Sequence, residues 1–221
     1  MKSLIRKIIF SAFIISLTAG PAFSIIEIGA EGTYGGYTLT NKDSSLGEKE
    51  LKFSGTGAAA YLHLTYGIPK LLTIGLGPSL DLAWLGYNGA IEGITTFASV
   101  RVAFEIMVGL DIVPYADPFV RIGYGVEFDG YDQEFSVFPG NPIPITMYGG
   151  SLHVNAGLII PLISVLRLTI EGGIVSGSLT TEATDPTGTA PQAVLDEIDK
   201  YTKSEFQHSG WHIGLGLQIS I

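Results

Sequence analysis

Apolar residues alternate with small or polar residues along eight separate stretches of the chain. A period of two is typical of β-strands that carry one apolar face. On the fourth stretch, for example, Val100, Val102 and Phe104 share one face. The pattern predicts strands over residues 26–38, 53–66, 72–87, 94–108, 118–128, 148–160, 166–179 and 211–221.

The charged residues inside these stretches all fall on the face opposite to the apolar one. They are Glu27, Glu31, Asp81, Arg101, Glu105, Arg121, Glu127, Arg167 and Glu171. A soluble β-sandwich turns its apolar face inward and exposes polar residues such as lysine. Here the lysines beyond the N-terminal segment lie in connections or at a strand end. An apolar exterior around a polar interior instead indicates a transmembrane β-barrel, with these nine side chains forming a charge network in its lumen.

The connections alternate between long and short, which predicts an orientation. One set is residues 39–52, 88–93, 129–147 and 180–210, and the other is 67–71, 109–117 and 161–165; the first set is the longer on average, although 88–93 is itself short. Outer-membrane barrels have long extracellular loops, short periplasmic turns and an aromatic girdle at each interface. The girdle residues expected from the apolar faces are Tyr34, Trp84, Phe128, Tyr148 and Trp211 at the long-loop end, and Tyr66 and Phe104 at the short-turn end. A soluble barrel with an aromatic core is the alternative.

Composition narrows the classes of function. The chain of 221 residues is 46% hydrophobic and only 15% charged, with a net charge of -9. An acidic chain gives no support to nucleic-acid binding through a basic face. There is no cysteine, which excludes disulfides and thiolate sites. We expect no cofactor and no metal site.

The N-terminus has the layout of a secretory signal peptide. Three basic residues precede an apolar stretch over residues 8–17, and small residues follow near Ser24. The stretch is too short for a stable spanning helix. The sequence predicts a signal peptide over residues 1–24 and a barrel over residues 25–221, with an uncleaved anchor as the alternative.

Together these strands resemble the eight-stranded outer-membrane barrels, the group that contains OmpX, OmpW and the membrane domain of OmpA. Gly216, Ile219 and Ile221 are similar to the C-terminal assembly signal of that group, although the group usually ends in an aromatic residue. The resemblance implies an all-β, eight-stranded antiparallel up-and-down transmembrane β-barrel. It also implies a location in the outer membrane of a Gram-negative-type envelope.

The partners expected of such a protein are the barrel assembly machinery and outer-membrane lipid, including lipopolysaccharide-type lipid where it is present. A host or extracellular ligand at the loops is a further expected partner. We expect a monomer that binds no nucleic acid.

Within the lumen, Glu105 and Arg121 should lie at similar depth on adjacent strands and form an ion pair. Arg101, halfway along its strand, is the expected central cation, bonded to one or more of Glu31, Asp81 and Glu171. The inward parity also includes His63, His153, His212, Asn155 and Gln218. Such a set suits either a packed structural interior or an ion path.

The function expected from this pattern is a structural or surface-interaction role without catalysis. The alternatives are a narrow channel or transporter for small solutes or apolar molecules, as in OmpW-like relatives, and a lipid A-modifying enzyme. For catalysis, His208 and Ser209 are adjacent and so face opposite sides of a strand, with no acid fixed beside them. Ser151 and His153 share one inward face near Glu127.

Two local features complete the predictions. Pro78 lies mid-strand on the lipid-facing side, where its missing N–H predicts a local bulge or a lost ladder bond. In the last long loop, Val194, Leu195, Ile198 and Tyr201 have helical spacing, which predicts a short helix within residues 191–206. The acids of this loop and of residues 129–134 suit a solvated surface or divalent-cation binding.

Overall fold

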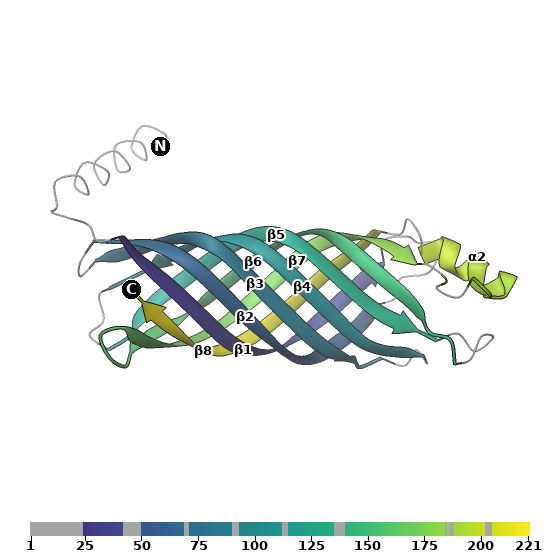
Figure 1. Cartoon of the computed structure of the whole chain (residues 1–221), viewed down its shortest axis with the longest axis horizontal. Helices are drawn as coiled ribbons and strands as arrows, with labels where there is room; N and C mark the ends of the chain where they lie inside the picture. The colour runs from purple at the N-terminus through teal and green to yellow at the C-terminus, as the bar shows by residue number, and fades with distance from the viewer. Residues whose placement is uncertain are drawn as a thin grey trace, which may run out of the picture.

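The computed structural model is a closed antiparallel β-barrel of eight strands (Figure 1). It describes residues 24–41, 50–68, 71–89, 93–111, 115–134, 140–183, 185, 188–201 and 205–221. The strands are β1 (Ser24–Asn41), β2 (Glu50–Ile68), β3 (Leu72–Tyr87), β4 (Ile94–Gly109), β5 (Asp117–Gln133), β6 (Ile143–Pro161), β7 (Leu166–Ala183) and β8 (Glu205–Ser220). Each strand pairs with its neighbours in sequence, which confirms the predicted up-and-down topology.

The barrel closes where β8 pairs with β1 from Glu27 opposite Ser220 to Asn41 opposite Phe206. Reciprocal backbone hydrogen bonds between Ile26 and Ile221, at 3.0 and 2.9 Å, extend this seam to the last residue. A closed sheet leaves no strand edge, so every strand can satisfy its backbone groups inside a bilayer. Among the described residues no helix is long and apolar enough to cross a membrane.

The two ends of the barrel differ. The C-terminus and the short connections lie at one end, whereas the long connections lie at the other (Figure 1). The last long connection contains a helix, α2 (Gln192–Tyr201), beyond the end of the barrel. The helix lies within the predicted range, but Phe206 belongs to β8. The predicted signal peptide over residues 1–24 lies outside the described residues except for Ser24.

Several strands continue further toward the long-loop end than the apolar alternation predicted. β6 begins at Ile143 instead of residue 148, and β8 begins at Glu205 instead of residue 211. In these extensions the polarity of the two faces is inverted. Ile145 and Met147 point inward and are buried, whereas Thr146 between them is exposed. A search for lipid-facing apolar positions therefore misses this part of the barrel.

Pro78 interrupts one of the two hydrogen-bond ladders that β3 forms with its neighbours. The pairing of β3 with β4 runs without a break past Pro78, which lies opposite Phe104. The pairing with β2 goes from Tyr61–Ser79 directly to Leu64–Leu76 and leaves out the intervening pairs, with no change of register. The predicted loss of a ladder bond is therefore on the β2 side, and the structure forms no bulge there.

Candidate functional site

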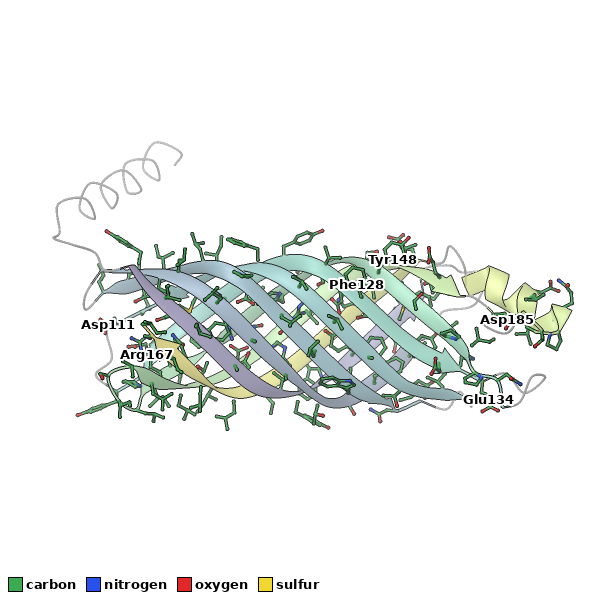
Figure 2. All side chains as sticks on the ribbon, in the orientation of Figure 1. Asp111, Phe128, Glu134, Tyr148, Arg167 and Asp185 are labelled. Atoms are coloured by element: carbon green, nitrogen blue, oxygen red, sulfur yellow. The ribbon has the colours of Figure 1, made fainter. Side chains whose placement is uncertain are left out.

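The lumen holds the charged side chains, and the outer wall holds the aromatic ones. Of the nine predicted lumen residues, Asp81 and Arg167 are partly exposed and the other seven are buried. The seven predicted girdle residues are all exposed on the outer wall. In Figure 2, Phe128 and Tyr148 lie toward the long-loop end, whereas Arg167 lies at the short-turn end.

The centre of the lumen is organised around Arg121 of β5. Its Nη2 contacts Glu171 of β7 and lies 3.3 Å from Oε1 of Glu31 of β1. Its Nη1 lies 3.7 Å from Oε2 of Glu105 of β4. The guanidinium also lies over the ring of Tyr61, 4.3 Å from its centroid. One cation therefore joins carboxylates from three other strands across the barrel.

Histidines and an amide complete this central layer. His63 Nε2 lies 3.1 Å from one carboxylate oxygen of Glu105, and His153 Nε2 lies 2.7 Å from the other. Asn155 donates a hydrogen bond of 2.9 Å to Glu171. His212 Nε2 lies 3.4 Å from the same oxygen of Glu171. Because buried carboxylates are costly without partners, these contacts stabilise the charges inside the wall.

A second polar layer lies toward the long-loop end. Arg101 contacts Oδ2 of Asp81 through Nε at 3.1 Å and Nη2 at 3.0 Å. His208 Nε2 lies 3.2 Å from Glu127, which also accepts a hydrogen bond from Ser99. A cavity of about 40 Å³ adjoins Asp81 and Arg101. That volume has room for a few water molecules at most.

A third polar layer lies toward the short-turn end. Arg167 donates a hydrogen bond of 2.9 Å to Glu27, and Tyr61 donates one of 3.2 Å to Gln218. A small apolar cluster of Met107, Phe119 and Ile159 is buried at this end.

An apolar plug, which the lipid-facing alternation does not predict, fills the lumen at the long-loop end. The rings of Phe53 and Phe97 stack with centroids 4.8 Å apart. Val194 of α2 is buried in the same cluster. The plug comprises Leu39, Leu51, Phe53, Leu85, Phe97, Tyr131, Ile143, Ile145, Met147, Leu179, Val194 and Phe206. The inward alternation of residues 143, 145 and 147 was the available signal.

Two expectations about the lumen need correction. The expected bond from Arg101 to Asp81 is confirmed, but among the described residues Arg121 contacts three carboxylates and is the central cation in place of Arg101. The reason is the tilt of the strands, because equal distance from a strand end does not mean equal height in a sheared barrel.

The histidine partners also differ from the sequence-based expectation. His208 points inward and has an acid beside it, Glu127. His153 binds Glu105 instead of lying with Glu127. Ser151, His153 and His208 are at most 1% exposed. The described residues contain no group of three or more histidine or acidic side chains that could hold a metal ion.

Comparisons with known proteins agree with this architecture. No protein-family model matches the chain, and no curated protein sequence matches it. Among solved structures, the outer membrane protein OprG from Pseudomonas aeruginosa is similar, with 10% identity, a TM-score of 0.50, and coverage of 92% of this chain and 98% of that one.

Two further solved structures are similar over comparable lengths. Neisserial surface protein A (NspA) has 12% identity and a TM-score of 0.47, with coverage of 88% of this chain and 96% of that one. Ail of Yersinia pestis has 13% identity and a TM-score of 0.44, with coverage of 89% and 99%. At such identities the likeness is one of fold.

The fold and its apolar belt define the class. The chain is an integral β-barrel protein of the outer membrane in a Gram-negative-type envelope. Its outer wall is apolar where lipid surrounds it, and its lumen is filled with polar side chains and an apolar plug.

Proposed function

We propose that this protein is a closed barrel that does not conduct ions and that carries an ordered surface structure above the outer membrane. The observation that carries the proposal is the Arg121 cluster. It crosses the lumen with contacts to Glu31, Glu105 and Glu171, each on a different strand. An eight-stranded barrel is only wide enough for its own side chains.

The apolar plug supports the same proposal. A hydrophobic constriction resists wetting and so excludes ions. Phe53, Phe97 and Val194 are each at most 2% exposed, and the plug lies between the polar layers and the outside. The cavity near Arg101 has room for only a few water molecules, which supports a closed lumen.

The burial of the candidate catalytic side chains supports a role without catalysis. Ser151 and His208, the serine and histidine nearest Glu127, are at most 1% exposed, which leaves little room for a substrate beside them. The long-loop end instead presents extended strands with polar outer faces, which suits interaction with an extracellular ligand. We therefore propose a structural or surface-interaction role.

Single-channel recording in planar bilayers tests the closed lumen. We expect the wild-type protein to show no steady conductance of porin size. Arg101→Ala should remove the partner of Asp81 and enlarge the cavity, and so produce at most brief leaks. Steady porin-sized currents in the wild type that Arg101→Ala leaves unaltered would reject the proposal and favour a channel. Val126→Ala, on the lipid-facing side of β5, is the control variant and should record like the wild type.

A further inference from the structure

The outer wall of the barrel is hollowed where β1 and β2 run side by side. Their outward faces carry only small residues there, with Ala30 opposite Ala60 and Gly32 opposite Ala58. A Cβ atom added to Gly32 would meet nothing within 4 Å. The hollow has a volume of about 500 Å³, within the range of roughly 300–1,000 Å³ that is usual for ligand pockets.

Large side chains form the two walls of this groove. On one side, Leu80 and Leu82 of β3 lie beside Ala60 and Ala58. On the other, β8 contributes Leu215 and Leu217, which lie opposite Gly32 and Ala30. The two walls are three strand spacings apart, about 14 Å between backbones. A second barrel is convex and would rest on the leucines without reaching the floor, whereas a flexible hydrocarbon chain fits between them.

The groove is closed at one end and open at the other. The pair Ile28–Leu62 blocks it near the middle of the membrane. Six residues along β2, about 20 Å away, it opens at Thr56 beside Trp84. The Tyr34 ring packs edge-on against Trp211 of β8, with centroids 6.2 Å apart. The open end therefore lies at the girdle of the long-loop side, so a ligand would have its polar end outward.

Polar groups continue the line of the groove above its open end. The outward face of β2 runs from Ala58 through Thr56 and Ser54 to Lys52. Lys52 is the one cation on the described outward strand faces at this end. It lies 3.0 Å from Glu50 with 61% of its side chain exposed. Such an exposed ion pair contributes little to stability. The ammonium group of Lys52 can therefore leave Glu50 and bind a phosphate.

We propose that this groove binds one acyl chain of an anionic lipid of the outer leaflet, with the headgroup beside Thr56, Ser54 and Lys52. The groove lies below the girdle, so hydrocarbon surrounds it. The spacing of the leucine walls leaves room for one acyl chain, and the positive charge of Lys52 favours a negatively charged headgroup. The site is on the outer wall, so it does not depend on whether the lumen conducts.

The two tryptophans of the chain, Trp84 and Trp211, stand on either side of the open end and report on it directly. The protein is reconstituted into phosphatidylcholine vesicles that contain a fixed small fraction of acyl-brominated phosphatidylglycerol or acyl-brominated phosphatidylcholine. We expect phosphatidylglycerol to quench tryptophan fluorescence at least twofold more than phosphatidylcholine at equal mole fraction. Equal quenching by the two lipids would overturn the proposal.

Variants separate the groove from general lipid contact. Gly32→Leu combined with Ala60→Leu fills the floor and should abolish the preference for phosphatidylglycerol. Ala156→Leu adds the same side chain to the outward face of β6 and should keep it. Lys52→Gln should remove the preference but leave quenching by phosphatidylcholine unchanged.

If the folded variant Gly32→Leu with Ala60→Leu keeps the preference for phosphatidylglycerol, the groove is not the binding site. Heat-dependent gel mobility checks folding. If the double variant does not fold, the wild-type comparison and Lys52→Gln still decide.

Discussion

At the scale of single residues, the lumen is a set of charges that depend on each other. All four histidines of the chain contact carboxylates at 2.7–3.4 Å. Three of these histidines contact Glu105 or Glu171, and both of these carboxylates also contact Arg121. A buried ion pair adds little net stability over an apolar replacement, yet removal of one partner leaves a bare charge behind.

This asymmetry predicts different costs for the two inner arginines. Arg121→Met should lower the free energy of unfolding by about 3–5 kcal/mol, because Glu31 and Glu171 remain buried without their cation. Arg101→Met should cost less, about 1–3 kcal/mol, because its partner Asp81 is 26% exposed and adjoins the cavity. Urea unfolding in lipid vesicles, followed by tryptophan fluorescence, measures both.

A control tests whether the loss comes from unpaired charge. In the Arg121→Met background, Glu31→Gln removes one stranded carboxylate and should restore part of the stability, since residues of one network are not additive. Equal losses for both arginine variants, or no recovery by Glu31→Gln, would show that Arg121 is not the centre of the network.

At the scale of strands, the sequence predicts the membrane-embedded part well because hydrocarbon imposes one rule. Every outward residue there must be apolar, so Val100 and Val126 mark their strands without reference to any neighbour. Partners across the lumen obey no such rule. The predicted pair of Glu105 with Arg121 forms between adjacent strands, where Arg121 lies two residues before Gly123, the register partner of Glu105. The contacts of Arg121 with Glu31 and Glu171 instead join strands that are not adjacent to β5. Register and shear fix such contacts, and neither is visible in one strand alone.

The strand ends beyond the girdle could not be predicted for a second reason. There the outer face meets water, so residues such as Thr146 and Glu182 lie outside while Ile145 and Leu179 fill the interior. Residues 142 and 144 are prolines, which by themselves indicate a loop. The continuous register from Gln133–Ile143 onward shows that β6 tolerates Pro144 close to its first residue.

The interrupted ladder at Pro78 gives a prediction at this scale. Because pairing is lost toward β2 and kept toward β4, the missing N–H is the one that would face Leu62. Pro78→Val should add a donor there and raise the free energy of unfolding by about 1 kcal/mol. Hydrogen exchange should show a protected amide at position 78.

Leu80→Val is the matched control, two residues away on the same face in an intact ladder. It should change stability little and leave exchange around residue 62 as it is. An unprotected amide in Pro78→Val would mean that close packing of Gly77 against Leu62, and not the missing donor, separates the two strands.

At the scale of the whole molecule, the barrel has two parts in which the polarity of the inner and outer faces is reversed. One part is apolar outside and charged inside, and the other is polar outside and apolar inside. The exposed outer residues of the second part are Glu50, Lys52, Thr96, Asp132, Thr146, Thr180, Glu182, Glu205 and Gln207. The girdle marks the change, and in the orientation proposed above the second part stands in water above the membrane. The plug thus serves as the hydrophobic core of a short barrel that stands on the membrane-embedded one.

Cysteine labelling can locate this change, because the chain has no cysteine of its own. Thr180 and Ile170 both lie on the outward face of β7, ten residues apart. That is about 33 Å along the strand, or roughly 25 Å of height at a tilt of about 40°. On intact cells, a membrane-impermeant maleimide should label Thr180→Cys and should not label Ile170→Cys, which faces hydrocarbon. Leu179→Cys, buried in the plug, should stay unlabelled until the protein is unfolded. Labelling of Ile170→Cys, or protection of Thr180→Cys, would place the membrane boundary elsewhere and remove the basis for a surface structure above it.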